Sequence, residues 1–331
     1  MRAIVCTAYG PPDVLELQEL EKPVPKDDEV LVKVFASTVS IGDCRVRSWN
    51  VPALFWILYR IQVGLTRPKR GILGAVLAGE VQAVGKDVTR FQIGDQVYGM
   101  DVAGIQGNAQ YACRAEGGAL AAKPANLTYE LAAAVPHGAM TARFFLRDKA
   151  NVQPGHKGLI NGASGAVGSW AVQLAKHYGA EVTGVCRTAS LDLVKALGAD
   201  RVIDYTREDF TASGETYDII FDAVAKSSFS RCEDSLEDDG VYLATDPTLA
   251  VVLSMVWTSI RGGKRALWAI GPERPQDLEA LREILEAGEA KPTIDRRYPL
   301  EKVAEAHSYV EEGHTKGVVV INVEHHEGGN P

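Results

Sequence analysis

The chain has 331 residues, of which 46% are hydrophobic and 24% charged, and its formal net charge is −8. This length predicts two domains, because a domain usually holds about 100–200 residues, and the negative charge argues against nucleic acid or an anionic membrane as a partner. The five cysteines are scattered and include no Cys-x-x-Cys pair, so neither a disulfide framework nor a zinc knuckle is indicated.

The amino-terminal part of the chain is rich in predicted strands. Met1–Ile4 leads directly into the first of them, so no signal peptide is expected, and the predicted location is the cytoplasm. The strand pattern changes near Lys123-Pro124, where we place a domain boundary. Short apolar runs separated by Gly and Pro are typical of strands joined by turns, and here they lie at residues 2–6, 30–38, 79–84, 96–99 and 109–114.

Two apolar stretches, residues 51–59 and 247–260, are shorter than the ~18–20 residues of a membrane-spanning helix, so no membrane span is predicted. A buried helix or core segment is the favoured interpretation of each stretch, and the alternative is an apolar substrate mouth or a subunit contact. The segment of residues 51–65 would suit a wall for flat apolar substrates, because aromatic side chains lie in or beside it: Trp49, Phe55, Trp56 and Tyr59.

The most informative motif lies in residues 157–179. A short apolar run, 158–160, predicts the end of a strand, and a helical pattern that ends at Gly179 follows the turn after it. A strand, a glycine turn and a helix N-terminus suit a dinucleotide pyrophosphate, because glycines allow close approach of the backbone and the helix offers free N–H groups. The turn is a variant of Gly-x-Gly-x-x-Gly, and its residues are Asn161, Gly162, Ala163, Ser164, Gly165, Ala166, Val167 and Gly168.

Strands and short helices alternate after the glycine turn. A short helix is predicted at residues 191–197. Alternation of this kind is typical of a parallel sheet covered on both faces. With the strand before the turn the predicted strands number six, as in a full dinucleotide-binding fold; the other five are 181–186, 201–204, 218–222, 240–244 and 266–270. We therefore predict an α/β fold with a doubly wound Rossmann domain over residues 126–270.

The carboxyl-terminal segment, residues 271–331, has a different pattern. Two helices are predicted at 275–287 and 300–312, and a strand at 318–323. The last eight residues are expected to fray. Their adjacent histidines, 325 and 326, could hold a metal, but a disordered end is the favoured interpretation.

The residues after the second strand of the Rossmann domain favour NADPH over NADH. An NAD enzyme usually places Asp or Glu there to bind the ribose 2′-hydroxyl, whereas this chain has Cys186-Arg187-Thr188. Arg187 could pair with a 2′-phosphate through a charge-assisted hydrogen bond, and Tyr205, at the end of the next strand, could add a hydroxyl donor. The alternative is an ordinary surface arginine, which would leave the cofactor choice open.

No zinc-ligand pattern is present. A catalytic zinc site needs three Cys, His or acidic ligands and an open position, and the chain has no His-Glu-x-x-His, no Gly-His-Glu and no lobe of four cysteines. Hydride transfer without a metal is therefore predicted.

Taken together, these features resemble the zinc-independent quinone oxidoreductases, the zeta-crystallin-like branch of the medium-chain dehydrogenase/reductase superfamily. The resemblance implies a GroES-like catalytic domain, residues 1–125 completed by 271–331, a Rossmann NADP-binding domain, and an active site in the cleft where they meet. It also implies a homodimer, formed by pairing exposed sheet edges. The matching segments run from end to end and are 78–85, 91–99, 140–142, 162–168, 197–205, 221–224 and 313–317.

The resemblance also implies where the chemistry lies. Zinc-dependent relatives carry ligands where Ser40 and Ala75 stand and near His137, so at most one ligand remains here. The anion that forms on a reduced acceptor needs a donor, and the candidates are Ser40, Arg45 and His137. Relatives often show Asn where Ser40 sits and Tyr where Arg45 sits.

Each catalytic candidate has a structural alternative. Ser40 could bond only to the backbone, and His137 could be a satisfied core histidine. Asp43 and Arg47, at i and i+4, could form a plain surface pair.

The resemblance implies further cofactor contacts. Thr141 would be a backbone or nicotinamide contact. Asp222-Ala223-Val224 and the strand end at 244–245 would flank the nicotinamide ribose and ring, and Lys316 with Gly317 would approach from the carboxyl-terminal segment.

The predicted function is NADPH-dependent transfer of a hydride to a small apolar quinone or α,β-unsaturated carbonyl. A zinc-free NAD(P)-dependent alcohol dehydrogenase and a non-catalytic NADPH-binding protein are the alternatives. A serine hydrolase is disfavoured because Gly-x-Ser-x-Gly would need Gly where Ala166 stands. A short-chain dehydrogenase is disfavoured, although Tyr298 and Lys302 satisfy Tyr-x-x-x-Lys, because the glycine loop opens the chain in that family.

Overall fold

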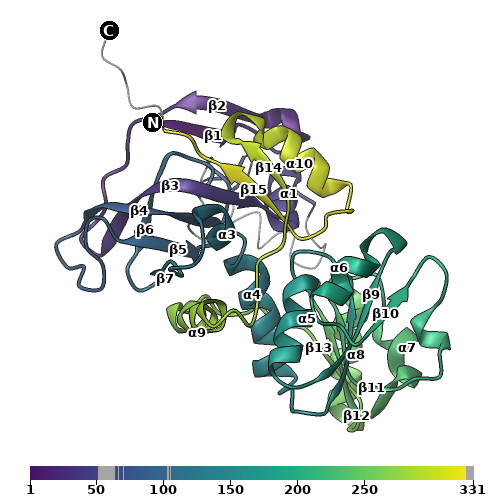
Figure 1. Ribbon diagram of the computed structural model, residues 1–331. Coiled ribbons are helices and arrows are strands. Elements are labelled where there is room, and N and C mark those ends of the chain that lie inside the picture. The colour runs from purple at the N-terminus through teal and green to yellow at the C-terminus, as the bar shows by residue number, and fades with distance from the viewer. Residues whose placement is uncertain (51–63, 66, 70, 103, 105, 326–331) are drawn as a thin grey trace. The chain divides into compact units, whose positions relative to one another are not determined.

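The computed structural model describes residues 1–50, 64–65, 67–69, 71–102, 104 and 106–325 (Figure 1). The chain divides into two compact units. Unit 1 comprises Met1–His137, Glu273–Gly288 and Pro292–Pro331, and unit 2 comprises Gly138–Pro272 and Glu289–Lys291. The domain limits at 125/126 and 270/271 stay predictions of where independently folding domains begin and end.

Unit 2, described throughout, is built on a six-stranded sheet in which every neighbouring pair is parallel (Figure 1). Across the sheet the strands are β10 (Arg201–Asp204), β9 (Glu181–Cys186), β8 (Lys157–Asn161), β11 (Tyr217–Asp222), β12 (Leu236–Ala244) and β13 (Arg265–Leu267). The strand order reverses between β8 and β11. In open α/β sheets such a switch point is where ligands bind, at the carboxyl ends of the strands.

Helices pack against this sheet because their apolar residues recur on one face. In α5 (Gly168–His177) the buried residues include Trp170, Leu174 and Ala175. The other helices of unit 2 are α6 (Leu191–Ala196), α7 (Phe229–Cys232) and α8 (Leu249–Arg261), and α4 (Pro136–Arg143) runs into unit 2 from unit 1 and continues as a π-helical segment to Lys149. The predicted Rossmann sheet is confirmed, with β13 ending three residues earlier than expected.

Unit 1 contains a mostly antiparallel sheet in its described residues. The order along the main path is β14 (Ile294–Pro299), β15 (Val318–Asn322), β3 (Glu29–Val39), β4 (Val76–Val84), β5 (Gln96–Met100) and β7 (Ala119–Ala122), with β6 (Tyr111–Ala115) paired to β3. A separate hairpin joins β1 (Arg2–Cys6) and β2 (Leu15–Glu19). The described part of unit 1 also has the helices α1 (Ile41–Ser48), α3 (Tyr129–Ala133), α9 (Pro275–Glu286) and α10 (Val303–Glu311).

The carboxyl-terminal segment completes the sheet of unit 1. β15 pairs antiparallel with β3, with Val319 opposite Val39 and Asn322 opposite Ala36. The apolar side chains of these strands are buried together with those of α10, in one core that includes Val32, Val303 and Ile321. The two ends of the sequence therefore form one folded unit.

The apolar stretch 247–260 forms α8, and its predicted burial is wrong. Only Val251 and Thr258 of this helix are buried. The helix packs beside β13 at the edge of the sheet, so a single face has a neighbour. Five large apolar side chains on α8 are 56–79% exposed, at a spacing that puts them on one face: Leu249, Leu253, Val256, Trp257 and Ile260.

The other apolar stretch, 51–59, lies outside the described residues, and with it most of the proposed aromatic wall. Of its aromatic residues Trp49 is described. It ends α1 with a left-handed backbone, φ 57°, and its ring centroid lies 4.9 Å from that of Tyr9.

The start of the chain's last eight residues is bound to unit 1, so the expectation of fraying is wrong there. His325 Nε2 donates to the Val34 carbonyl at 2.7 Å. Its ring lies edge-on to Phe35 and Tyr111, at centroid distances of 5.4 and 5.5 Å. The apolar contacts hold this histidine after the strand has ended.

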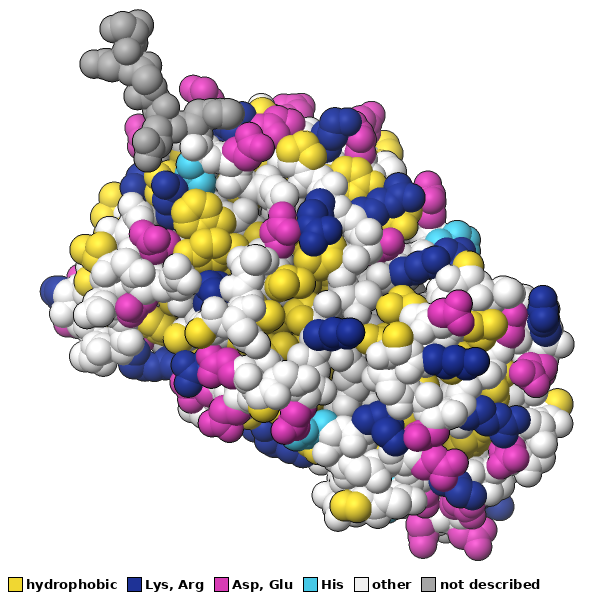
Figure 2. All heavy atoms as spheres, viewed as in Figure 1, with side chains coloured by type: hydrophobic (Ala, Val, Ile, Leu, Met, Phe, Trp, Pro, Cys, Tyr) yellow, Lys and Arg dark blue, Asp and Glu magenta, His cyan; other side chains and the backbone are white. Residues whose placement is uncertain are grey.

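Lys and Arg side chains lie beside Asp and Glu over much of the face that Figure 2 shows. Within the described part of the chain, no helix has the length and apolar character that crossing a membrane requires.

Candidate cofactor site and active-site residues

The glycine turn after β8 is tightly bonded to β9. The N–H groups of Gly162 and Ala163 both donate to the Val185 carbonyl at 3.0 Å, and the Gly165 N–H donates to the Gly162 carbonyl at 3.0 Å. Gly162 has φ 80°, and a Cβ there would lie 2.4 Å from Val224 Cγ1. A side chain at this position would therefore be both strained and blocked.

The other two glycines have different roles. A Cβ at Gly168 would lie 2.1 Å from the Gly162 carbonyl oxygen, so this glycine lets α5 pack closely on the turn. A Cβ at Gly165 would meet nothing nearer than that same oxygen, at 3.5 Å. Protein packing therefore does not account for Gly165. Its N–H and its carbonyl are both hydrogen-bonded within the protein, but the space that a side chain would fill is free for a ligand.

The start of α5 also suits an anion. Among the described residues no side chain caps this helix. The N–H groups of Ser169 and Ala171 already donate to the Gly165 and Val167 carbonyls, both at 2.9 Å, so what the helix start offers an anion is mainly the positive end of its dipole. Ser164, Ala166 and Val167, in the turn before it, are partly exposed. The free space at Gly165 and the uncapped helix start fit a dinucleotide pyrophosphate.

Arg187 and Tyr205 follow the ends of neighbouring strands. Asp204 of β10 lies opposite Cys186 of β9, so the two candidate residues come directly after a paired position. The Tyr205 N–H donates to the Cys186 carbonyl at 3.1 Å, and the Tyr205 side chain is 55% exposed. The structure thus brings both candidates together at the carboxyl ends of β9 and β10. Arg187 is partly buried there.

Asp204 is an acid at this edge that the sequence analysis missed. Its carboxylate accepts hydrogen bonds from Thr188 Oγ1 at 2.5 Å and from Thr206 Oγ1 at 2.7 Å. The hydrogen bond from Thr188 is the main cause that lowers the pKa of Asp204 below its usual value. Both carboxylate oxygens are therefore engaged by neighbouring threonines. A polar residue directly after the apolar pair Val202-Ile203 was the available signal.

Ala223 and Val224 lie beside the glycine turn. The Ala223 N–H donates to the Asn161 carbonyl at 3.1 Å, and Val224 is 42% exposed next to Gly162. Thr141 is partly buried on α4 in unit 2. Unit 2 therefore contains every cofactor candidate except Lys316 and Gly317.

Ser40 is the N-cap of α1 and forms a capping box with Asp43. Its hydroxyl donates to Asp43 Oδ2 at 2.6 Å and accepts from the Asp43 N–H at 3.2 Å. The Ser40 N–H donates to the same carboxylate at 2.8 Å. The Ser40 proton is therefore held by Asp43 in this structure.

Asp43 and Arg47 are buried, so a surface pair is the wrong interpretation. Arg47 is 1% exposed and forms an ion pair with Glu311 of α10. Asp43 Oδ1 accepts from the Gly74 N–H at 3.2 Å. The reason is that α1 packs against α10, which covers the helix face that carries these two side chains.

Cys44 of α1 also contacts α10: its Sγ lies 3.4 Å from His307 Nδ1. Burial lowers the pKa of His307 to about 4, against the opposing effect of the Asp43 carboxylate. Burial also raises the pKa of the Cys44 thiol. Both groups are therefore neutral near pH 7, and this pair is part of the core.

His137 and Arg45 belong to unit 1, as does Ser40. Burial lowers the pKa of His137, although the Asp43 carboxylate opposes that change. His137 is therefore neutral near pH 7, and its ring can still donate one N–H. Arg45 is partly exposed on α1, and its carbonyl accepts from the Trp49 and Asn50 N–H groups.

Lys316 precedes β15 in unit 1, and its N–H donates to Asp295 Oδ2 at 2.9 Å. The Tyr298 and Lys302 pair also lies in unit 1, whereas the glycine turn is in unit 2. Lys302 forms a salt bridge with Glu305 at 3.2 Å. Across the described residues, no group of three or more His, Cys, Asp or Glu side chains is arranged to hold a metal ion.

Two protein families match the chain. Residues 26–153 match the alcohol dehydrogenase GroES-like domain, and residues 197–321 match a family described as zinc-binding dehydrogenase.

Relatives match over nearly the whole chain. The mitochondrial NAD(P)H oxidoreductase RTN4IP1 of Mus musculus is 33% identical, over 98% of this chain and 89% of the relative. The chloroplastic NADPH-dependent alkenal/one oxidoreductase of Arabidopsis thaliana is 32% identical, over 97% of this chain and 79% of the relative. The quinone oxidoreductase structure from Coxiella burnetii superposes with a TM-score of 0.87 at 28% identity, covering 98% and 99% of the two chains. The chain therefore belongs to the medium-chain dehydrogenase/reductase superfamily, in its quinone-oxidoreductase-like branch, and is an oxidoreductase.

Proposed function

We propose that this protein is a zinc-independent, NADPH-dependent reductase of quinone-like or α,β-unsaturated carbonyl acceptors. The observation that carries the proposal is the free space at the Cβ position of Gly165 in front of the uncapped α5, with Arg187 and Tyr205 at the neighbouring strand ends. The names of the Mus musculus, Arabidopsis thaliana and Coxiella burnetii relatives support a nicotinamide cofactor and acceptors of these two classes.

NADPH is favoured over NADH by the residues after β9 and β10. Arg187 offers the charge that a 2′-phosphate requires, and Tyr205 offers a hydroxyl. Asp204 is the one acid at these strand ends that could accept from a ribose 2′-hydroxyl, but its oxygens already accept from Thr188 and Thr206. When bound, the cofactor supplies a hydride from its nicotinamide ring.

The chain's own contribution to the chemistry is to bind the acceptor and stabilise the anion that forms on its oxygen. Ser40 is a weaker candidate donor than Arg45 or His137, because its proton is held by Asp43. Arg45 would donate as a cation and His137 as a neutral imidazole. Zinc is not required in this proposal, since Ser40, Ala75 and His137 stand at the three ligand positions and leave at most one ligand.

A homodimer and a cytoplasmic location belong to the proposal as well. The support for a dimer is the exposed apolar face of α8 beside β13, which ends the sheet of unit 2 on that side. An exposed strand edge and a large apolar patch are both common at subunit contacts. The mouse relative is named as mitochondrial and the Arabidopsis relative as chloroplastic, so the cytoplasmic location stays a prediction.

Turnover by chelator-treated protein tests the proposal. NADPH oxidation is followed with a benzoquinone, an alkenal and the saturated aldehyde of the same chain length, each with and without added zinc. We expect turnover of the quinone or the alkenal, little with the saturated aldehyde, and no increase with zinc. Activity that is confined to alcohols and saturated aldehydes, or that requires zinc, would contradict the proposal.

A further inference from the structure

A fully buried carboxylate, Asp222, ends β11 at the switch point of the sheet. It is a neighbour of the glycine turn, because it lies opposite Asn161, the last residue of β8. The carboxylate accepts five hydrogen bonds, and the donors are Asn161 Nδ2 (3.0 Å), the Tyr242 hydroxyl (3.0 Å) and the N–H groups of Ser227 (2.8 Å), Val224 (3.3 Å) and Lys226 (3.4 Å).

Three of these donors belong to one loop, residues 223–227, which passes next to the glycine turn. Val224 Cγ1 would lie only 2.4 Å from a Cβ at Gly162, so the loop and the turn are packed without space between them. The Ala223 N–H also bonds to the Asn161 carbonyl, at 3.1 Å. The position of this loop therefore sets the shape of the surface beside the glycine turn.

One residue of the loop, Ala225, has an unfavourable backbone conformation. Ala225 has φ 51°, in the left-handed region that residues with a Cβ rarely adopt. The N–H groups on both sides, at Val224 and Lys226, donate to Asp222 Oδ1. A strained backbone persists where its surroundings over-determine it, and here the Asp222 carboxylate provides that support.

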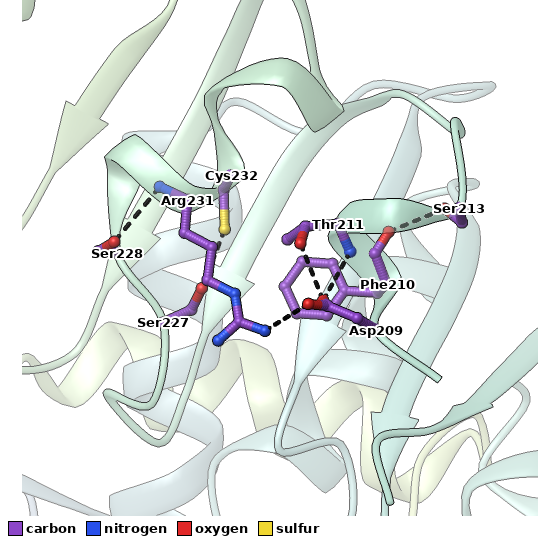
Figure 3. Close-up of polar contacts among 8 residues, drawn as sticks. All are labelled: Asp209, Phe210, Thr211, Ser213, Ser227, Ser228, Arg231 and Cys232. Carbon is purple, nitrogen blue, oxygen red and sulfur yellow. Dashed lines mark hydrogen bonds and ion pairs between the residues drawn. The ribbon is translucent and has the colours of Figure 1, made fainter. Parts of the chain in front are cut away.

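The far end of the loop is fixed by a second set of contacts (Figure 3). Ser227 Oγ lies 3.1 Å from Cys232 Sγ, and Ser228 caps α7 by accepting from the Arg231 N–H. Figure 3 shows the Arg231 guanidinium extended to Asp209, at 2.6 Å. Burial raises the pKa of Cys232 to about 11, so the thiol keeps its proton and can donate.

The Tyr242 hydroxyl is also a donor to Asp222 rather than an acceptor. Burial, followed by the Asp222 carboxylate, raises the pKa of Tyr242. The phenol therefore stays protonated, and its one proton goes to the carboxylate at 3.0 Å. Every donor around Asp222 comes from unit 2, so the arrangement exists within that unit.

We infer that Asp222 is a positioning residue for the cofactor: it holds the 223–227 loop and Asn161 in their binding arrangement before any cofactor is present. This inference rests on the proposed function, because it concerns the same nicotinamide cofactor. Asp222 itself is buried and acts through the loop. Its loss should weaken cofactor binding more than it weakens the fold.

The test compares Asp222→Asn with Asp218→Asn. Asp218 lies on the same strand at its other end, where Oδ2 accepts from the Lys157 N–H of β8 at 2.7 Å. The control therefore changes a carboxylate that joins the same two strands at the end away from the glycine turn, but that is half-buried and accepts one hydrogen bond there instead of five. Three quantities are measured for each protein: the NADPH dissociation constant, the free energy of unfolding in urea, and amide hydrogen exchange of residues 223–227 without cofactor.

We expect Asp222→Asn to raise the NADPH dissociation constant by roughly tenfold or more, the effect of losing a hydrogen bond to a charged group. Exchange at Val224, Lys226 and Ser227 should accelerate in the cofactor-free protein. Asp218→Asn should leave the dissociation constant within about twofold of wild type, on the same scale of tenfold per 1.4 kcal/mol.

An unchanged dissociation constant in folded Asp222→Asn, or an equal loss in both variants, would overturn the inference. Should Asp222→Asn fail to fold, Tyr242→Phe removes one donor only and should weaken binding by a few-fold, and no change there would overturn the inference too. Failure of the wild-type protein to bind either NADPH or NADH would overturn the proposed function, and with it this inference. The wild-type titration alone gives that result, so it is distinguished from an effect of the variants.

Discussion

At the scale of single residues, the glycine turn depends on the absence of particular side chains. Gly162 combines a positive φ with a close neighbour, Val224, whereas Gly155 has the similar φ of 85° and nothing within 4 Å of its missing Cβ. The two positions therefore separate backbone strain from steric conflict.

We predict that Gly162→Ala weakens NADPH binding, whereas Gly155→Ala does not. Both variants should lose roughly 1–2 kcal/mol of stability from the left-handed backbone. Gly162→Ala should lose further stability and also NADPH affinity, because its Cβ would displace Val224 beside the glycine turn. Urea unfolding and NADPH titration of both variants provide the comparison. Equal stability and equal affinity in the two would mean that the contact with Val224 is unimportant.

The sequence alone predicts the positions of some residues of the candidate site but not of others. Arg187 and Tyr205 could be placed at strand ends because β9 and β10 are short apolar runs that each follow a glycine, Gly179 or Gly198. Asp204 was missed because its partners, Thr188 and Thr206, matter only once two strands pair. Asn161 and Asp222 are 61 residues apart in the chain, and no local pattern indicates their hydrogen bond.

At the scale of elements, α1 is held against α10 by buried charge. Arg47 is almost fully buried, and its partner Glu311 is about one-third exposed. Losing the arginine leaves a carboxylate that water can reach, whereas losing the glutamate charge leaves a cation in the core. The two losses should therefore not be equivalent.

We predict that Glu311→Gln destabilises the protein more than Arg47→Met does. Breaking a buried pair costs roughly 3–5 kcal/mol. The loss of unfolding free energy in Glu311→Gln should be near or below the lower end of this range, because Glu311 is partly exposed. Arg47→Met in the Glu311→Gln background should restore part of the loss. Denaturant unfolding of the three variants measures these differences. A larger loss for Arg47→Met alone would contradict this account.

The same interface predicts a pH dependence. His307 has a pKa of about 4 in the folded protein, below the ordinary value of 6.5, so the unfolded chain takes up a proton first as the pH falls. Stability from this group is complete above about pH 6.5 and is lost toward pH 4, by about 2 kcal/mol between pH 7 and pH 5. The lowered pKa of His137 acts in the same direction.

Urea unfolding of His307→Gln at pH 7 and pH 5 checks this dependence. The difference in unfolding free energy between the two pH values should shrink. An undiminished difference in His307→Gln would show that another group causes it.

Element prediction succeeded for strands with strong apolar patterns and failed for edges. β9 and β10 have the predicted bounds, because each begins two or three residues after a glycine, Gly179 or Gly198, that ends a helix. β2 and β14 were missed, since Glu16, Glu19, Arg296 and Arg297 interrupt their patterns and pairing with a distant strand makes them strands. The burial of α8 was predicted wrongly because composition does not reveal which face has a neighbour.

At the scale of the whole molecule, β13 is one of the two edge strands of the sheet in unit 2, and α8 packs beside it. The apolar side chains on α8 would be covered if a second copy bound there by a twofold axis. We predict that the wild-type protein has twice the mass of one chain in solution and that the double variant Leu253→Ser/Val256→Ser has the mass of one.

Light scattering coupled to size-exclusion chromatography measures these masses. Val24→Ser removes an apolar side chain that is 84% exposed in unit 1 and should leave the dimer intact. A wild-type monomer, or a double variant that remains a dimer, would contradict the role of α8.

Binding of NADPH through the glycine turn and Arg187 is what the proposed function requires first. The most direct measurement is calorimetric titration of NADPH and NADH into the wild-type protein, Arg187→Ala and Arg201→Ala. Arg201 begins β10, at the opposite end of the strand from Tyr205, and pairs with Glu215 at 3.3 Å. We predict that NADPH binds the wild type at least about tenfold more tightly than NADH, as expected for a charge-assisted phosphate contact. Arg187→Ala should lose this preference and Arg201→Ala should keep it. Equal affinities in the wild type, a preference for NADH, or a preference that survives in Arg187→Ala would contradict the claim.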